Sequence, residues 1–380
     1  MEGILCFSRC MEIKYRFLDA GSDAEIFQWL ELYQVCFQHK VSCKFWDWIH
    51  RENPFYIKVK PLVLIAELDN RIVGSVSLIP SPLQVMPDQN LCSLNSCLVC
   101  KAMVHPEYQG QGIFPSLLKN AIKQARDEGY DLLISFSNNP YSYQSLVRAG
   151  FTYITDIIQS KYYLSADGPF KKYLAVLPRF MGKILGFPLS WMYTRLIPAV
   201  HHDYRIDYRD ATECSGEINR IYALHHSDSG VYGVRTPPFI RWRFSYPQFH
   251  FKCLSLRIGE QMLAYLIIEY KDEGKTALVV DIFARDNDES LILTLVSELV
   301  TILKKEHFDS IQTYLIERNG SVSRIFSLRH GFIGRSSGSD KKTKPRFLYY
   351  PLKEHLCNTS FSDKNQWNIQ SVDTCMFWAE

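Results

Sequence analysis

Two segments of this 380-residue chain recur in the same order, and this internal repetition constrains the fold more than any single motif. Residues 45–55 (FWDWIHRENPF) recur in outline as residues 239–249 (FIRWRFSYPQF), with an aromatic start, a shared Trp and a Pro near the end. Residues 129–151 end in Arg-Ala-Gly-Phe, and residues 307–332 end in Arg-His-Gly-Phe. Two landmarks in one order at similar separation predict a tandem duplication whose halves are joined across residues 165–205.

The composition is that of a globular protein with room for two hydrophobic cores. The chain has 43 Lys and Arg residues against 40 Asp and Glu, a net charge of +3, and 47% of its residues are hydrophobic. A domain usually takes about 100–200 residues, so the length is sufficient for two. The near-neutral charge argues against a dedicated nucleic-acid binder and against a disordered acidic protein. No nucleic-acid partner is expected.

The eleven cysteines are scattered and follow no disulfide framework. We interpret them as mostly buried thiols of a protein in a reducing compartment, and therefore predict a cytoplasmic location. Cys97 and Cys100 have the spacing of half a zinc site, but no second pair follows at a suitable distance, and a strand would point them to opposite faces. The adjacent histidine pairs at 201–202 and 225–226 likewise have no second pair of metal ligands at a suitable distance. No metal site is expected.

Neither a signal peptide nor a membrane span is predicted. The first six residues include an acid, Glu2, and lack the basic and long apolar regions of a signal peptide. The most hydrophobic stretch, residues 174–200, is interrupted by three basic residues and three prolines, so it has no run of about 20 uncharged apolar residues. Such a stretch could lie on a membrane surface, but a connector packed between two domains is the simpler interpretation.

Hydrophobic periodicity predicts the elements of the first half. Residues 25–37 have apolar side chains at helical spacing, and residues 113–127 keep that spacing up to a helix stop at Gly129. Two strands are expected on either side of a hairpin turn at residues 69–71. The predicted order is helix, three strands, helix, strand, helix, over residues 25–37, 61–68, 72–78, 98–104, 113–127, 131–136 and 141–148.

A loop with two glycines lies between the strand that ends near Val104 and the helix that begins near Ile113. Gly110 and Gly112 would let the backbone approach a bulky anion, and the unpaired N–H groups and positive dipole end of the helix would face it. This arrangement suits a pyrophosphate, although two glycines before a helix can also form only a tight turn. The loop has neither the Gly-Lys-Ser/Thr of a Walker loop nor the third glycine of a dinucleotide fingerprint.

The sequence around this loop resembles the GNAT superfamily of acyl-CoA-dependent N-acyltransferases. Residues 103–113 (MVHPEYQGQGI) and the Phe114 that follows are similar to its acyl-CoA motif, Val-x-Pro-x-x-Arg/Gln-x-x-Gly-x-Gly/Ala, at every position but the last. Asn139, followed by Gly150-Phe151, is similar to the later Asn…Gly-Phe segment of the family. The resemblance covers residues 13–165, and the second half matches in outline only.

The resemblance implies an α+β (α/β-type) architecture of tandem GNAT folds, each a mixed, mostly antiparallel central sheet flanked by helices. We therefore expect a GNAT domain with the acyl-CoA site over residues 1–165 and a connector over 166–204. A degenerate GNAT-like domain would follow over 205–352, and a C-terminal tail over 353–380. Because the tail contains Trp367, Phe377 and Trp378, we expect it to fold back on a domain.

The resemblance also implies where acyl-CoA, the co-substrate, would bind. In the family, two adjacent strands separate, and the backbone of one of them pairs with the pantetheine arm much as an added strand would. A backbone N–H near the end of that strand could also stabilise the oxyanion formed during acyl transfer. The residues carried over to this chain are Ala102, Met103 and Val104 for the pantetheine, Gln109, Gly110, Gln111, Gly112, Ile113 and Phe114 for the pyrophosphate, and Asn139 and Ser142 beside them.

Two departures from the family bear on the chemistry. Phe114 stands where a small residue is usual, and would either cover the cofactor or pack inward. Leu146 stands where the family often has a Tyr that protonates the leaving thiolate. Tyr143 or Tyr141 would replace it, or the thiolate would leave without a dedicated acid, since a thiol is acidic enough near neutral pH.

The attacking amine must be neutral, so a general base is also needed. Glu67 on a strand, His105 at the end of the cofactor-side strand and Glu107 beside it are the candidates. Each also has an ordinary explanation, because Glu67 could lie on a solvated strand face, Glu107 in an exposed loop, and His105 at a variable position of the motif. The predicted catalytic set is Glu67, His105 and Tyr143.

The second half has lost the glycine loop. Its matching segment, residues 279–290, has no glycine and carries Asp286, Asp288 and Glu289 where phosphates would have to lie. Three carboxylates there would repel a pyrophosphate. This half is expected to be structural, to complete the cleft or to select the acceptor.

The predicted function is transfer of an acetyl or related acyl group from acyl-CoA to a primary amine on a small molecule or peptide, by direct attack of the amine. One alternative is a catalytically silent acyl-CoA-binding or regulatory protein. Another is an aminoacyl-tRNA-dependent transferase with a tandem GNAT-like fold, which the retained glycine loop and the weak net charge disfavour. The acceptor, the acyl group and the oligomeric state stay open, because a fold does not choose among them.

Overall fold

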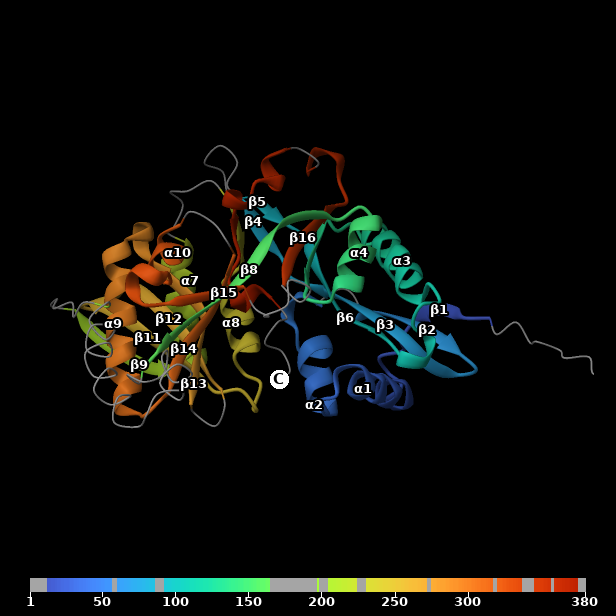
Figure 1. Ribbon diagram of the computed structural model, residues 1–380, viewed down its shortest axis with the longest axis horizontal. Coiled ribbons are helices and arrows are strands. Elements are labelled where there is room, and N and C mark those ends of the chain that lie inside the picture. Colours follow the sequence, from blue (N-terminus) through green and yellow to red (C-terminus); the bar gives the residue numbers. More distant parts are fainter. Residues whose placement is uncertain are drawn as a thin grey trace, which may run out of the picture.

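The computed structural model describes residues 12–56, 60–85, 92–164, 197, 204–223, 230–271, 275–316, 320–336, 345–356 and 359–374 (Figure 1). The predicted connector, residues 166–204, lies outside these ranges except for Ile197 and Tyr204. The two histidine pairs and the last two aromatic residues of the tail, Phe377 and Trp378, also lie outside the described residues.

The first half forms a sheet flanked by helices, in the predicted order. Its turn between β2 and β3 places Asp69 and Asn70 at φ of 48° and 62°, the geometry of a two-residue hairpin. The predicted helices and strands are confirmed, and β1, α2, the pair β4 and β5, and β8 are additions. The elements are β1 (Lys14–Phe17), α1 (Asp23–Phe37), α2 (Cys43–Trp46), β2 (Leu62–Leu68), β3 (Arg71–Pro80), β4 (Leu83–Val85), β5 (Cys92–Leu94), β6 (Ser96–Val104), α3 (Ile113–Asp127), β7 (Leu132–Ser137), α4 (Pro140–Arg148) and β8 (Thr152–Tyr163).

The second half repeats this order of elements. Strand β9 corresponds to β1, the hairpin β11–β12 to β2–β3, and β13, α9 and β14 to β6, α3 and β7. The elements are β9 (Arg205–Asp210), α7 (Ser215–Ala223), β10 (Val231–Gly233), α8 (Pro237–Arg243), β11 (Phe251–Ile258), β12 (Gln261–Lys271), β13 (Thr276–Ala284), α9 (Glu289–Lys305), β14 (Ser310–Ile316), α10 (Ser321–Ile325), β15 (Ile333–Ser336), β16 (Arg346–Pro351) and β17 (Trp367–Asn368).

The strands of both halves join into one sheet. Its order is β1-β2-β3-β6-β7-β16-β8-β14-β13-β12-β11-β9, with β15 pairing β8. Within this sheet only the pairs β6–β7 and β13–β14 are parallel, and the other pairs are antiparallel. The predicted class, a mixed and mostly antiparallel sheet with flanking helices in each half, is confirmed, and the structure adds that the two sheets join.

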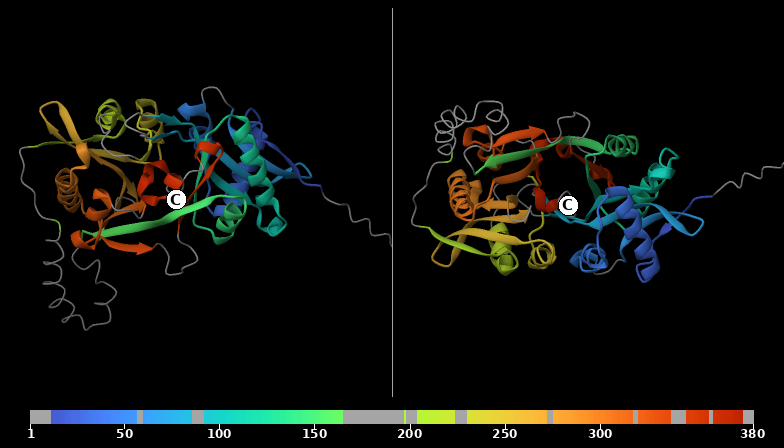
Figure 2. Two further views of the ribbon diagram at one scale, coloured as in Figure 1. Left: turned by 90° about the horizontal axis from the view of Figure 1, so that it is seen from above. Right: turned by 60° about the horizontal axis from the view of Figure 1, so that its bottom comes forward.

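The half with β1 to β8 is called the first unit below, and the half with β9 to β17 the second unit. The two units exchange strands. The first part of β8, residues 152–156, pairs with β16, and the remainder pairs with β14 and β15 of the second unit. Strand β16 returns in the other direction and lies between β7 and β8, so the second half of the sequence supplies a strand to the first sheet. Figure 2 shows β8 running from the first unit to the second. The end of the region predicted as the second domain, residues 205–352, thus completes the first sheet.

The two repeated tryptophan segments meet at the junction of the units. The indole N–H of Trp48 donates to the carbonyl of Trp242 at 2.8 Å, and the indole N–H of Trp242 donates to the carbonyl of Trp48 at 2.6 Å. Both side chains are buried. Each residue makes the interaction that its counterpart makes, as in an interface between two identical subunits.

Three hydrophobic clusters form the core. One lies between the first sheet and α3, and includes Leu117, Leu118 and Ala121. A second lies between the second sheet and α9. The largest covers the other face of the first sheet, under α1 and α2, and continues into the second unit through α8. Cys97 belongs to the first cluster and Cys100 to the largest, so the two thiols point to opposite faces, as expected.

The C-terminal tail packs against the body of the protein over its described part. Trp367 is fully buried, and β17 pairs with β10 in a second sheet of order β17-β10-β4-β5. This sheet contains strands from both units, because β10 also pairs with β4. The expectation that the aromatic tail folds back is confirmed for these residues. No helix within the described ranges is long and apolar enough to cross a membrane.

His50 is a buried neutral imidazole, and it predicts a pH dependence of stability. Its side chain is fully buried against Trp46 and Trp29, and neither ring nitrogen has a hydrogen-bond partner among the described residues. Burial, and to a smaller extent the charge of Lys101, lowers the pKa of His50 to about 3. Below its ordinary pKa of about 6.5 the unfolded chain binds a proton that the folded chain does not, so stability falls as the pH falls.

The expected loss is about 2 kcal/mol between pH 6.5 and pH 5, at about 1.4 kcal/mol per pH unit. Urea unfolding at both pH values should show this loss in the wild type and a correspondingly smaller one in His50→Phe. His39→Phe, at an exposed position, serves as the control and should behave as the wild type. An equal loss in the wild type and in His50→Phe would contradict the assignment.

Candidate functional site

Strands β6 and β7 separate in the first unit. They pair in parallel from Ser96 with Leu132 to Val99 with Ser135, and β6 then continues for five more residues to Val104. On its other edge β6 still pairs with β3 at Met103 and Val104. Residues 100–104 therefore lie past the last residue of β6 that pairs with β7, with one backbone edge on the β7 side. Ala102, Met103 and Val104, predicted to contact a pantetheine arm, lie on this segment.

A backbone irregularity marks the start of the separated segment. The register between β3 and β6 shifts here, and Lys101 takes a φ of 49°. The Lys101 ammonium lies 5.4 Å from the ring centroids of both Tyr33 and Phe45. Lys101 is not among the site residues predicted from the sequence. A charged residue within the otherwise apolar run of residues 97–104 was the signal that could have found it.

The loop after β6 leads directly to the start of α3. Gly110 and Gly112 have φ of 80° and 76°, and a Cβ atom at either position would meet no atom within 4 Å. Positive φ at both positions is a conformation that glycine adopts without strain. Helix α3 begins at Ile113 with no side chain capping its first turn, whereas α1 and α4 begin with the side-chain caps Ser22 and Asn139. The loop therefore leaves open space above uncapped helical N–H groups.

The remaining residues of the predicted donor set surround this loop. Gln109 folds back and its Nε2 donates to the Val104 carbonyl at 3.1 Å, and Gln111 is exposed. Ile113 is buried, and Phe114 is half-buried against the cluster under α3. Of the two alternatives for Phe114, packing inward is the one that this position supports.

Asn139 and Ser142 lie at the start of α4. The Asn139 Oδ1 accepts hydrogen bonds from the backbone N–H of Tyr141 at 2.8 Å and of Ser142 at 3.4 Å. The side-chain carbonyl of Asn139 therefore caps the N-terminus of α4. Leu146, which replaces the usual tyrosine of the family, is buried in the cluster under α3.

The structure does not bring the three predicted catalytic residues together. Glu67 lies on β2, two strands from β6, where its carboxylate accepts from Arg16 Nε at 2.8 Å. His105 follows β6 directly, and its Nδ1 accepts from the Glu107 backbone N–H at 3.4 Å. Tyr143 lies on α4, half-buried in the same cluster as Ala102 and Val104. Only His105 and Tyr143 adjoin the separated strands.

Arg346 is a further charged residue beside the site, and it comes from the exchanged strand. Its guanidinium carbon lies 4.2 Å from the centroid of the Tyr143 ring. Strand β16 places it there by pairing Arg346 with Ser137 of β7. Tyr141, the other candidate acid, is 80% exposed. The sequence could not reveal this contact, because nothing local assigns residue 346 to the first sheet.

The corresponding loop of the second unit is closed by its own carboxylates. Asp286 and Asn287 take the positive φ values, 57° and 52°. Asp288 caps α9, with its Oδ1 accepting from the Ser290 backbone N–H at 2.7 Å. Glu289 is paired with Arg324. A carboxylate therefore already occupies the helix N-terminus in the place where the first unit has open space.

Within the described residues there is no group of three or more His, Cys, Asp or Glu side chains that could hold a metal ion.

Comparison with known proteins agrees with this geometry. Residues 18–154 match the family model of the acetyltransferase (GNAT) domain. No curated protein sequence matches the chain.

Several solved structures share the fold at low sequence identity. A GCN5-related N-acetyltransferase from Anabaena variabilis has a TM-score of 0.60 at 11% identity, over 90% of this chain and 73% of that one. A probable N-acyltransferase from Enterococcus faecalis V583 has a TM-score of 0.62 at 10% identity, with the same coverage. A tandem GNAT protein from the clavulanic acid biosynthesis pathway has a TM-score of 0.55 at 14% identity, over 90% of this chain and 99% of that one. Residues 18–154 are thus a GNAT acetyltransferase domain, within a chain that has the tandem GNAT fold.

Proposed function

We propose that the chain is an acyl-CoA-dependent N-acyltransferase that moves an acetyl or related acyl group to a primary amine. One observation carries this proposal. Beyond the pairing of β6 with β7, residues 102–104 lead directly into the open glycine loop and the uncapped start of α3. A backbone edge suited to the amide-bearing pantetheine arm thus adjoins an anion site suited to the pyrophosphate. The two features follow each other as the arm and the pyrophosphate do in CoA.

Each part of the donor has a matching feature in this segment. The backbone N–H and C=O groups of Ala102 to Val104 can pair with the two amides of a pantetheine arm, as an added strand would. The N–H groups at the start of α3 and the helix dipole favour the negative charge of a pyrophosphate. Gln109 would release the Val104 carbonyl when the arm binds, because its side chain now donates to that carbonyl.

The chemistry would be direct attack of the amine nitrogen on the thioester carbonyl. A new C–N bond forms, the C–S bond breaks, and the amine proton passes to a base while the thiolate gains a proton. A backbone N–H of the separated β6 segment would stabilise the oxyanion that develops on the carbonyl. Domain two, predicted over residues 205–352, would support this site through β16 and help to shape the acceptor side.

His105 and Tyr143 are the groups we assign to proton transfer. Glu67 is paired with Arg16 and lies two strands away, so it is set aside as the base. His105 follows the separated segment and its side chain is 22% exposed, so an acceptor amine can reach it. Tyr143 is proposed as the acid toward the thiolate, with the positive charge of Arg346 against its ring.

We also propose a cytoplasmic location. Support comes from the described cysteines, which are thiols and not disulfides.

The experiment is release of free CoA from acetyl-CoA across a panel of primary amines, including polyamines, amino sugars and peptides. We expect turnover with at least one class of amine. His105→Gln should lower kcat by about 10²–10⁴ with an unchanged acetyl-CoA affinity, whereas Tyr141→Phe should leave kcat unchanged and Tyr143→Phe should reduce it. Binding of acetyl-CoA without turnover on any amine would instead support the silent binding protein.

A further inference from the structure

The second unit has a counterpart of the separated strands of the first. Strands β13 and β14 pair in parallel from Thr276 with Ser310 to Val279 with Thr313. Beyond that point β13 continues to Ala284 and β14 to Ile316. The backbone edges that face each other past Val279 are therefore not paired with each other.

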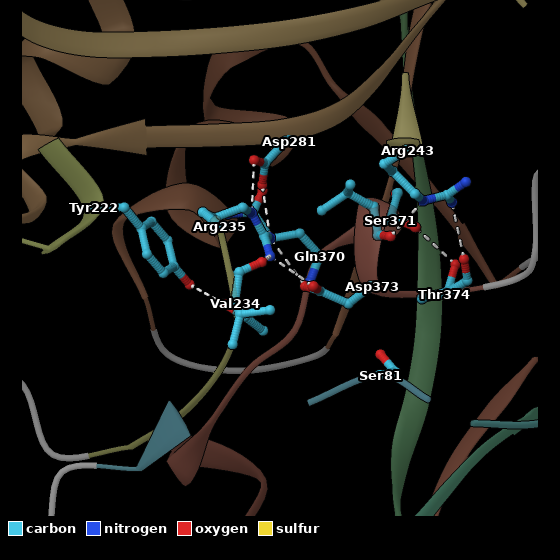
Figure 3. A network of polar contacts seen from close by, with 12 residues as sticks. Ser81, Tyr222, Val234, Arg235, Arg243, Asp281, Gln370, Ser371, Asp373 and Thr374 are labelled. Carbon is cyan, nitrogen blue, oxygen red and sulfur yellow. Dashed lines mark hydrogen bonds and ion pairs between the residues drawn. The ribbon is translucent and has the colours of Figure 1, made fainter. Parts of the chain in front are cut away.

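A segment near the C-terminus of the chain lies between these two strands. The carboxamide of Gln370 makes two hydrogen bonds with one residue of β13: its Oε1 accepts from the Ile282 N–H at 2.8 Å, and its Nε2 donates to the Ile282 carbonyl at 2.7 Å. The next residue, Ser371, donates through Oγ to the Tyr314 carbonyl of β14 at 3.1 Å. The segment thus contacts both strands at the place where they separate. Figure 3 shows Gln370, Ser371 and Asp373 of this segment with Arg235, Arg243 and Asp281 around them.

Charged groups fix the part of the segment that follows Gln370. Asp373 pairs with Arg235 at 2.7 Å, and Arg235 also pairs with Asp281 of β13 at 2.9 Å. Arg243 of α8 donates to the carbonyls of Val372 at 3.0 Å and Thr374 at 3.2 Å. Burial raises the pKa of Asp281, and the charge of Arg235 opposes that rise. The segment is therefore held by buried ionic contacts as well as by the hydrogen bonds of Gln370 and Ser371.

Little space remains beside the segment. The cavity between β13, the start of α10 and the segment has a volume of about 60 Å³, and Gln370 is one of its walls. Pockets that hold drug-sized ligands have volumes of about 300–1,000 Å³. The small cavity and the Asp288 cap of α9 together leave no room for a pantetheine arm while the segment is in place.

We propose that residues 367–374 act as a built-in ligand of the second unit. The segment occupies the counterpart of the donor cleft, and the Gln370 carboxamide makes the paired hydrogen bonds that an amide of a pantetheine arm would make with a separated strand. The segment stays in place when the donor binds, so the chain takes up a single acyl-CoA, in the first unit. This last consequence rests on the proposed function, whereas the occupancy of the second cleft does not.

Hydrogen exchange of the full chain, followed by mass spectrometry, tests the proposal. The readout is exchange at the Ile282 amide, in a peptide that covers residues 279–284. Gln370→Ala should speed this exchange about fivefold to tenfold, as expected for loss of one amide hydrogen bond. Gln366→Ala, four residues earlier in the same tail, should leave it unchanged. Gln370→Glu keeps the acceptor for the Ile282 N–H and loses only the donor to the Ile282 carbonyl, so exchange at Ile282 should stay closer to the wild type than in Gln370→Ala.

Addition of acetyl-CoA separates this proposal from the proposed function. We expect acetyl-CoA to slow exchange at residues 100–104 and to leave residues 279–284 unchanged. A change at residues 279–284 on addition of acetyl-CoA, or no effect of either Gln370 variant, would overturn the inference. If acetyl-CoA altered neither region while Gln370→Ala still sped exchange at Ile282, the inference would stand and the proposed donor site would fall.

Discussion

Gly112→Asp should abolish binding of acetyl-CoA, with an affinity loss of at least about 100-fold. The new carboxylate would lie at the uncapped start of α3, where it would take up the helical N–H groups and repel the pyrophosphate. The second unit already has this arrangement, because Asp288 caps α9. The measurement is thermal unfolding with and without ligand. Acetyl-CoA at about 100 times its dissociation constant should stabilise the wild type by about 2.7 kcal/mol and the variant not at all.

Gly129→Asp is the matched control for this experiment. Gly129 follows the other end of α3 and has a φ of 80°, and a Cβ atom there would meet no atom within 4 Å, as at Gly112. The same substitution therefore meets the same backbone constraint but adds its charge far from the loop. Gly129→Asp should keep the ligand-induced stabilisation. Equal loss of binding in the two variants, or full binding in Gly112→Asp, would contradict the assignment of the loop.

Arg235→Leu should destabilise the fold by about 3–5 kcal/mol, the second large effect we expect. The Arg235 side chain is fully buried between the carboxylates of Asp281 and Asp373, which are themselves buried. Removing one partner of a buried ion pair leaves uncompensated buried charge. Here two carboxylates would lose their cation at once, with only Tyr265 still donating to Asp281. The free energy of unfolding in urea measures the loss.

Arg324→Leu provides the comparison for Arg235→Leu. Arg324 also pairs with a carboxylate, that of Glu289, but 55% of its side chain and 44% of that of Glu289 are exposed. An exposed pair usually contributes at most about 1 kcal/mol. We therefore expect Arg324→Leu to change stability by less than about 1 kcal/mol. Similar effects for the two substitutions would show that burial does not set the energetics of the Arg235 cluster.

Local sequence patterns predicted the elements around the candidate site. The hairpin at Asp69 and Asn70, the helix after Gly112 and the short helix before Gly150 depend on neighbours within a few residues, so they can be inferred without the fold. The repeat of residues 45–55 at 239–249 predicted two similar units, and the structure adds that Trp48 and Trp242 contact each other. A duplicated segment can indicate symmetry, but it does not reveal where the two copies meet.

Contacts between distant parts of the chain could not be predicted in the same way. Nothing in residues 346–351 (RFLYYP) selects β7 of the first unit over β14 of the second as the neighbour. The contact of Arg346 with Tyr143 was therefore not foreseen. The Arg235 cluster joins residues that are 46 and 138 positions apart in the chain, and Gln370 pairs with a residue 88 positions away. Such pairings depend on tertiary packing and leave no periodic signal.

A crystal structure of the full chain with bound CoA tests the central claim most directly. We expect one CoA per chain, with its pantetheine arm along residues 100–104 of β6 and its pyrophosphate at residues 109–114. We also expect that Gln370 still pairs with Ile282 between β13 and β14. CoA bound between β13 and β14, or bound away from both pairs of separated strands, would contradict the central claim.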